Sequence, residues 1–197
     1  MTFKVKDHYF NLAKKKNYLA RSAFKLEEIN NKYKVVGKSD QVLDLGYFPG
    51  SWVQYVSGLK GFTGKITGVD IQGVNESLNR AENITLFEKS IEDIHQLSDI
   101  DVHKKFDVIL SDMAPKTIGI KTVDQLRSLG LVEFVFSKID LFLIEGGNLV
   151  VKIFESQDAQ NFFKTEQKRF EKMTFFRPKS TRKVSKEYFA IFKGFKG

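Results

Sequence analysis

Short apolar runs rich in β-branched residues alternate along this chain with longer stretches of helical periodicity. The runs that we expect to form strands cover residues 41–46, 65–71, 84–88, 106–112 and 147–154, followed by two late runs at 174–177 and 187–195. Helices are expected between them, most clearly at 123–145 and 157–170, and one helix at 18–34 precedes the first strand. Strands that alternate with helices form parallel sheets covered on both faces. The pattern therefore predicts an α/β fold.

Length and composition indicate one domain without disulfides. With 197 residues, the chain can bury one good core but is short for two, so we expect a single domain over 1–197. It has no cysteine, and its three histidines show no ligand spacing with carboxylates, so no metal site is expected. No apolar stretch reaches membrane-spanning length, and MTFKVKDHYF lacks a signal-peptide core. We expect an intracellular monomer that is neither secreted nor membrane-bound; cytoplasmic, nuclear and organellar locations, the mitochondrion included, stay open.

Positive charge is concentrated at the two ends of the chain. Residues 1–38, the basic segment before the first strand, carry ten Lys and Arg against three Asp and Glu, and residues 164–197 carry eleven against three. Residues 39–163 carry eleven against eighteen, although the net charge of the whole chain is +8. If both ends fold onto one face, they form a basic surface suited to a nucleic-acid backbone. The alternative is that the lysines only increase solubility.

The first expected strand ends in a glycine turn, Gly46-Tyr-Phe-Pro-Gly50, where a ligand of a parallel sheet would bind. The turn lacks the middle glycine of a dinucleotide fingerprint, Pro49 has no N–H to offer a phosphate, and no G-K-[ST] follows. Asp70 ends the second expected strand, where a carboxylate can bind a ribose diol. A ribose without a pyrophosphate indicates a nucleoside cofactor, and S-adenosylmethionine is the obvious candidate.

Five motifs are distributed over nearly the whole chain: YLARSAFKLEEIN (18–30), DLGYFPGSW (44–52), SDMAP (111–115), GGNLVVKIF (146–154) and RPKSTRKVSKEYF (177–189). In order and spacing they resemble the FtsJ/RrmJ family of RNA 2′-O-ribose methyltransferases. The resemblance implies a Rossmann-like class I methyltransferase fold, with a mostly parallel seven-stranded sheet, helices on both faces and an antiparallel last strand. It also implies methyl transfer from S-adenosylmethionine to a ribose 2′-hydroxyl in RNA. SDMAP is more similar to the large-subunit rRNA branch than to the tRNA branch.

The resemblance further implies a catalytic tetrad, which falls on Lys25, Asp112, Lys152 and Glu187. Lys152 would be the general base for the 2′-hydroxyl, Asp112 would orient its amine, and Glu187 would hold Lys25 or the ribose. Lys152 also has support of its own, because it interrupts an apolar run expected to be a buried strand, where an unpaired ammonium is costly. The other three have structural alternatives: a turn cap for Asp112, a helical pair with Glu28 for Lys25, and a surface ion pair with Lys183 or Lys186 for Glu187.

The cofactor-binding residues follow from the same matching. They are Gly46, Phe48, Pro49, Gly50, Ser51, Trp52, Asp70, Ile71, Ser90, Ile91 and Asp112. Ser90 stands where the family has an aspartate that contacts adenine, so this contact is in question. Tyr47 and Phe48 replace two small residues of the family, and they either pack beneath the turn or narrow the pocket. The structural alternative for Trp52 is a place in the core.

The RNA-binding surface is expected to surround the tetrad. Arg21, Lys179, Arg182 and Lys183, together with Lys14 to Lys16, would bind phosphates around the pocket that holds Lys152. Other functions stay open: a tRNA or mRNA-cap 2′-O-methyltransferase would carry a similar tetrad, and an inactive member of the fold would only bind RNA. Pro49 disfavours a nicotinamide enzyme. The sequence names neither the modified nucleotide nor the state of the RNA, naked or within a ribosomal particle.

Overall fold

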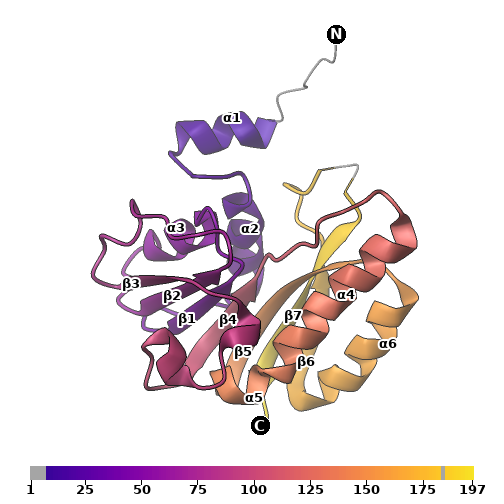
Figure 1. Cartoon of the computed structure of the whole chain (residues 1–197). Helices are drawn as coiled ribbons and strands as arrows, with labels where there is room; N and C mark the ends of the chain where they lie inside the picture. Colours follow the sequence, from indigo (N-terminus) through magenta and orange to yellow (C-terminus); the bar gives the residue numbers. More distant parts are fainter. Residues whose placement is uncertain (1–7, 183–184) are drawn as a thin grey trace.

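The computed structural model describes residues 8–182 and 185–197, and one seven-stranded sheet forms its centre (Figure 1). Its strands are β1 (Gln41–Leu45), β2 (Lys65–Asp70), β3 (Ile84–Glu88), β4 (Phe106–Ser111), β5 (Leu143–Phe154), β6 (Phe170–Phe176) and β7 (Glu187–Phe195). They lie in the order β3-β2-β1-β4-β5-β7-β6. The first five pair in parallel, whereas β7 runs antiparallel to both β5 and β6. The predicted sheet and its antiparallel last strand are confirmed.

Helices cover both faces of the sheet. On one face, α2 (Ala23–Tyr33) and α3 (Ser51–Ser57) share a buried core with the sheet. On the other face, α4 (Lys121–Ser137), α5 (Ile139–Phe142) and α6 (Gln157–Glu166) pack over a second core rich in phenylalanine. Short 3₁₀ turns lie at η1 (Ile91–Asp93), η2 (Leu97–Ile100) and η3 (Gln167–Arg169). Among the described residues, none of the helices has both the length and the apolar character needed to span a bilayer.

Three predicted helix boundaries are wrong. The helix expected at 123–145 gives way to β5 at Leu143, because Leu143 pairs with Phe106 of β4. The helix expected at 157–170 ends earlier, since Phe170 already pairs with Phe195 of β7. In both cases apolar residues keep helical spacing across the boundary, and sheet pairing decides the conformation. The helix expected at 18–34 begins only at Ala23, because residues 19–22 form bends and turns.

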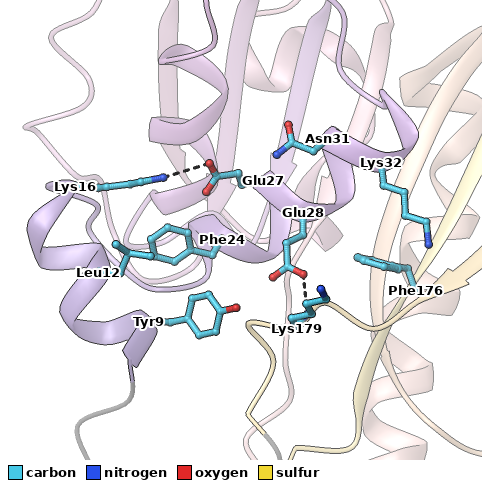
Figure 2. A pocket seen from close by; sticks show the side chains of 10 residues that line it. All are labelled: Tyr9, Leu12, Lys16, Phe24, Glu27, Glu28, Asn31, Lys32, Phe176 and Lys179. Atoms are coloured by element: carbon cyan, nitrogen blue, oxygen red, sulfur yellow. Dashed lines mark hydrogen bonds and ion pairs between the residues drawn. The ribbon is translucent and has the colours of Figure 1, made fainter.

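An additional helix, α1 (His8–Lys15), lies across α2, at the end of the sheet where the β6–β7 connection also lies (Figure 1). The ring of Tyr9 packs against the ring of Phe24 at a centroid distance of 5.5 Å (Figure 2). Just beyond α1, the ammonium of Lys16 pairs with Glu27 of α2 at 3.3 Å. Only Ala13 is buried on α1, and the helix has eight residues, so it depends on its contacts with α2.

Candidate active site

Strand register brings two charged side chains to the same face of the sheet. Lys152 of β5 lies opposite Phe189 of β7, and Glu187 comes two residues before Phe189. Because side chains alternate between the faces of a strand, all three lie on one face, and α2 covers that face. Asp112 directly follows β4, whose last residue, Ser111, pairs with Val151 of β5. Residues far apart in the sequence therefore meet beside the carboxyl ends of β4 and β5.

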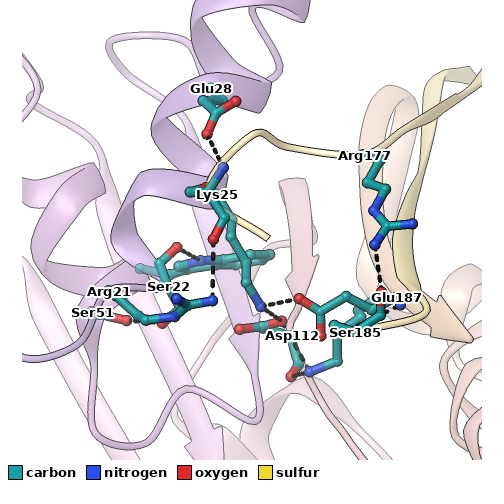
Figure 3. A network of polar contacts seen from close by, with 12 residues as sticks. Arg21, Ser22, Lys25, Glu28, Ser51, Asp112, Arg177, Ser185 and Glu187 are labelled. Carbon is teal, nitrogen blue, oxygen red and sulfur yellow. Dashed lines mark hydrogen bonds and ion pairs between the residues drawn. The ribbon is translucent and has the colours of Figure 1, made fainter. Parts of the chain in front are cut away.

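The four tetrad residues form one connected ionic network. Lys25 of α2 reaches Glu187 at 2.5 Å and Asp112 Oδ1 at 3.8 Å (Figure 3). Lys152 Nζ lies 3.0 Å from the same Asp112 oxygen and donates a hydrogen bond to the Asp112 backbone carbonyl. The side chains of Lys25 and Lys152 are 9% and 6% exposed. Two buried amino groups thus share one carboxylate, and Lys25 pairs within this network rather than with Glu28.

Glu28 instead fastens α2 to the segment that follows β6. Its carboxylate accepts hydrogen bonds from the backbone N–H groups of Lys179 at 2.7 Å and Ser180 at 2.9 Å. One turn before Lys25, Arg21 donates to the backbone carbonyl of Ser180 at 3.1 Å. Lys25 and Glu28 share one face of α2, and Arg21 lies just before the helix, so these contacts hold Lys25 near the start of β7.

The glycine turn forms the floor of a cavity at the carboxyl ends of β1, β2 and β4. Gly46 has φ +73°, and a Cβ atom there would meet Met113 Cγ at 2.4 Å, so both conformation and space require glycine. Tyr47 is buried beneath the turn and donates to the carbonyl of Gly73 at 2.8 Å. Phe48 is 39% exposed and lines the cavity. Of the two alternatives expected from the sequence, Tyr47 therefore packs beneath the turn and Phe48 narrows the cavity.

This Gly46 cavity has a volume of about 380 Å³. Its walls are Leu45, Gly46, Phe48, Val69, Asp70, Ile71, Gln72, Lys89, Ser90, Ile91, Glu92, Asp112, Met113, Ala114 and Leu131. Asp70 shapes the entrance, because its two carboxylate oxygens accept hydrogen bonds from the backbone N–H groups of Phe48 at 2.9 Å and Gln72 at 2.8 Å. Ser90 caps η1 by accepting a hydrogen bond from the N–H of Glu92 at 3.2 Å. Most of the lining is apolar, and its charged residues are Asp70, Lys89, Glu92 and Asp112.

Asp44, in the middle of β1, is a buried carboxylate that lacks a partner. It is 1% exposed, and neither of its oxygens accepts a hydrogen bond from a residue that the structure describes. Burial, reinforced by the negative charges of Asp112 and Asp70, raises the pKa of Asp44 well above its ordinary value. Asp44 lines a narrow recess together with Ser51, Trp52 and Asp112, next to the Gly46 cavity. A buried carboxylate without a partner is costly, so the recess suits a cationic group.

Sequence comparison identifies the family. A family model described as FtsJ-like methyltransferase matches residues 18–195. The chain belongs to this family. The resemblance drawn from the five motifs is confirmed, and so is the prediction that the chain is a methyltransferase.

Two relatives of this FtsJ-like methyltransferase are named ribosomal RNA large subunit methyltransferase E. The protein of Bdellovibrio bacteriovorus is 42% identical, with 97% of each chain covered. The protein of Syntrophobacter fumaroxidans is 38% identical, over 97% of this chain and 96% of its own. A crystal structure described as a ribosomal RNA methyltransferase from Plasmodium falciparum has a TM-score of 0.78 and 28% identity, and it covers 91% of this chain and 100% of its own.

In this methyltransferase, the residues expected to bind a cofactor fall into three groups. Seven of them line the Gly46 cavity, namely Gly46, Phe48, Asp70, Ile71, Ser90, Ile91 and Asp112. Ser51 and Trp52 lie at the narrow recess, where Trp52 is also part of the core and donates to the carbonyl of Ser22 at 2.8 Å. Pro49 and Gly50 lie in the turn, where Gly50, at φ +107°, precedes α3, and neither is among the residues that line the cavity.

The residues expected to bind RNA gather around α1, α2 and the β6–β7 connection. Lys179 and Arg182 are exposed, as are Lys14 to Lys16, whereas Arg21 is partly buried against Ser180. Lys183 lies outside the described residues. Asp44 was not among the predicted site residues, although a carboxylate inside the apolar run VLDLG is as costly to bury as Lys152 in its own apolar run.

Proposed function

We propose that this FtsJ-like methyltransferase transfers a methyl group from S-adenosylmethionine to a ribose 2′-hydroxyl of large-subunit ribosomal RNA. One observation carries the proposal: Asp112 both lines the Gly46 cavity and holds the buried amine of Lys152. A cofactor in the cavity and a base beside it would thus share a wall. The names of the relatives support ribosomal RNA of the large subunit as the substrate.

The residues of the cavity fit this cofactor. Asp44 and Asp112 offer negative charge to a cationic ligand, and Asp44 has no other partner among the described residues. Asp70 can accept hydrogen bonds from a ribose diol in addition to those from the two backbone N–H groups. Ile71 and Ile91 supply apolar walls for an adenine ring. When bound, S-adenosylmethionine supplies a methyl group activated by a sulfonium.

In the proposed mechanism the tetrad prepares the 2′-hydroxyl as the nucleophile. Lys152, in its neutral form, accepts the hydroxyl proton and becomes an ammonium that Asp112 stabilises at 3.0 Å. Asp112 also fixes the direction of the amine, because Lys152 donates to its backbone carbonyl. Lys25, held by Glu187, is a second hydrogen-bond donor that can position the ribose. Burial of the network excludes water that would compete for the base.

Binding of S-adenosylmethionine should release a proton from Asp44. The raised pKa keeps Asp44 protonated in the free protein at pH values where an ordinary aspartate is ionised, and a cationic ligand favours the carboxylate. Affinity should therefore rise with pH until the pH exceeds the raised pKa, and then level off. Calorimetry in two buffers of different ionisation enthalpy should detect up to about one proton released per ligand.

The control for this experiment is Asp44→Asn, which keeps the shape of the side chain but cannot ionise. This variant should bind with the same heat in both buffers. If the heat of cofactor binding to the unmodified protein is the same in both buffers at every pH tested, the assignment of Asp44 to the cationic part of the ligand is wrong.

The substrate assignment is tested by methyl labelling. Purified protein and labelled S-adenosylmethionine are incubated with large ribosomal subunits, with free large-subunit RNA and with tRNA, and the 2′-O-methyl positions are then mapped. The proposal requires labelling at a ribose of large-subunit RNA, either naked or in the particle. Labelling of tRNA alone, or of a base instead of a ribose, would contradict it.

A further inference from the structure

A second hollow lies along α2, beside the tetrad. It has a volume of about 570 Å³ and opens between α1, α2 and the β6–β7 connection (Figure 2). Tyr9 of α1, Phe24 of α2 and Phe176 of β6 contribute aromatic rings to its lining. We call it the Tyr9 hollow. The volume is sufficient for one planar aromatic ligand with its sugar. The partly exposed rings of Tyr9 and Phe176 offer surfaces on which such a ligand can stack, whereas Phe24 is buried and supports Tyr9 from below.

Lysines surround this aromatic lining, and its two carboxylates already have partners within the protein. Lys16, Lys32 and Lys179 line the hollow, and the ammonium of Lys32 lies 4.8 Å from the centre of the Phe176 ring. Glu27 pairs with Lys16 at 3.3 Å. Glu28 accepts two backbone hydrogen bonds from the segment after β6. Lys32 and Lys179 are exposed, so their charges are available to the phosphates on either side of a bound base.

The contacts of α2 with the segment before β7 connect the Tyr9 hollow to the tetrad. Lys25 projects from α2 toward Asp112 and Glu187, whereas Glu28, one turn further along the helix, lines the hollow. Glu28 also fixes the segment that leads into β7, where Glu187 begins the strand. A chain of nucleotides with one ribose at Lys152 would therefore cross this segment to reach the hollow.

We propose that the Tyr9 hollow binds an unpaired nucleobase of the substrate RNA, close to the nucleotide that is methylated. Proteins that hold single-stranded RNA combine a cationic path for the backbone with aromatic rings for the bases, and the hollow has both. The Asn31 amide, a donor and an acceptor, lines the same space and can hydrogen-bond to a base edge. This inference rests on the proposed function for the identity of the substrate, but not on methyl transfer itself.

The test compares two aromatic residues of α1 in binding experiments without cofactor. Tyr9→Ala should weaken binding of a single-stranded RNA oligonucleotide by about tenfold or more, because one stacked base is lost. Tyr9→Phe keeps the ring and should retain most of the affinity. Phe10→Ala is the matched control, since Phe10 is 41% exposed on the same helix and is not among the residues that line the hollow. A fully paired RNA of the same length should be insensitive to Tyr9→Ala.

Photo-crosslinking of the unmodified protein keeps the test independent of how the variants fold. A single-stranded RNA that contains 4-thiouridine should crosslink to peptides that include Tyr9, Phe24 or Phe176, as identified by mass spectrometry. Crosslinks confined to other peptides, or equal losses in Tyr9→Ala and Phe10→Ala, would overturn the inference. A third result would also overturn the inference: Tyr9→Ala and Phe10→Ala leave the affinity for naked RNA unchanged, but Tyr9→Ala weakens binding to ribosomal particles. The hollow would then bind a ribosomal protein. Absence of methyl transfer with intact RNA binding would refute the proposed function instead.

Discussion

Replacing Lys152 with alanine is expected to lower the rate of methyl transfer by about 10²–10⁴-fold, the usual effect of losing a general base. Cofactor binding should change little, because Lys152 is not among the residues that line the Gly46 cavity. Single-turnover measurements with enzyme and cofactor in excess over RNA would report the chemical step, and calorimetry would report the affinity for the cofactor. Near-normal turnover in this variant would show that the proposed mechanism is wrong.

Lys152→Arg separates a base from a structural cation. Arginine can still pair with Asp112, but it does not lose its proton near neutral pH. A general base predicts that both variants are inactive, whereas an ion pair that only supports the fold predicts that arginine restores activity. Thermal unfolding of both proteins is the necessary check, because Lys152 is buried and its removal leaves Asp112 with Lys25 at 3.8 Å.

Asp70→Ala is expected to weaken the binding of S-adenosylmethionine by about 10- to 100-fold. Each hydrogen bond to a charged group contributes roughly 1.5–3 kcal/mol, and about 1.4 kcal/mol corresponds to a factor of ten. Asp70 would supply such bonds to the ribose, and it also holds the backbone of Phe48 and Gln72 at the entrance of the cavity. The affinity for RNA should stay the same, because the basic surface lies on other elements.

Asp70→Asn helps to separate these two contributions. It keeps the size of the side chain and one acceptor oxygen, so it should weaken cofactor binding less than alanine does. Glu82→Ala is the matched control, since Glu82 is an exposed carboxylate just before β3 and carries the same charge. Calorimetry that finds equal cofactor affinity in Asp70→Ala and the unmodified protein would refute the placement of the ribose.

The sequence was sufficient to predict the seven strands but not all of their limits or those of the helices, since β5 and β6 each begin four residues before the expected 147 and 174. Strands β1, β2 and β4 agree with the expected 41–46, 65–71 and 106–112, and each ends one residue earlier than expected. The agreement is close because apolar β-branched runs followed by turn residues are typical of strands. The boundary between α5 and β5 could not be predicted, since Phe142 and Leu143 are equally apolar and only pairing with β4 separates them. For α1, the decisive contact is with Phe24 on another helix.

The candidate site shows the same division. Lys152 could be singled out because a charge inside an apolar run must have a function or a partner. Asp44 satisfies the same criterion, because it interrupts the apolar run that ends at the glycine turn. By contrast, the hydrogen bonds from Lys179 and Ser180 to Glu28 join residues about 150 positions apart, and no local pattern predicts such a contact.

The order of the strands separates two tasks within one sheet. The Gly46 cavity is built where β1, β2, β3 and β4 end, whereas Lys152 and Glu187 belong to β5 and β7. Glu187 is the first residue of β7 and pairs with Phe154, the last residue of β5, so it lies where a paired strand opens most readily. Fraying there would remove the partner of Lys25 and leave the cavity intact. Under the proposed mechanism, opening of β7 at Glu187 is expected to impair methyl transfer more than cofactor binding, because Glu187 does not line the cavity.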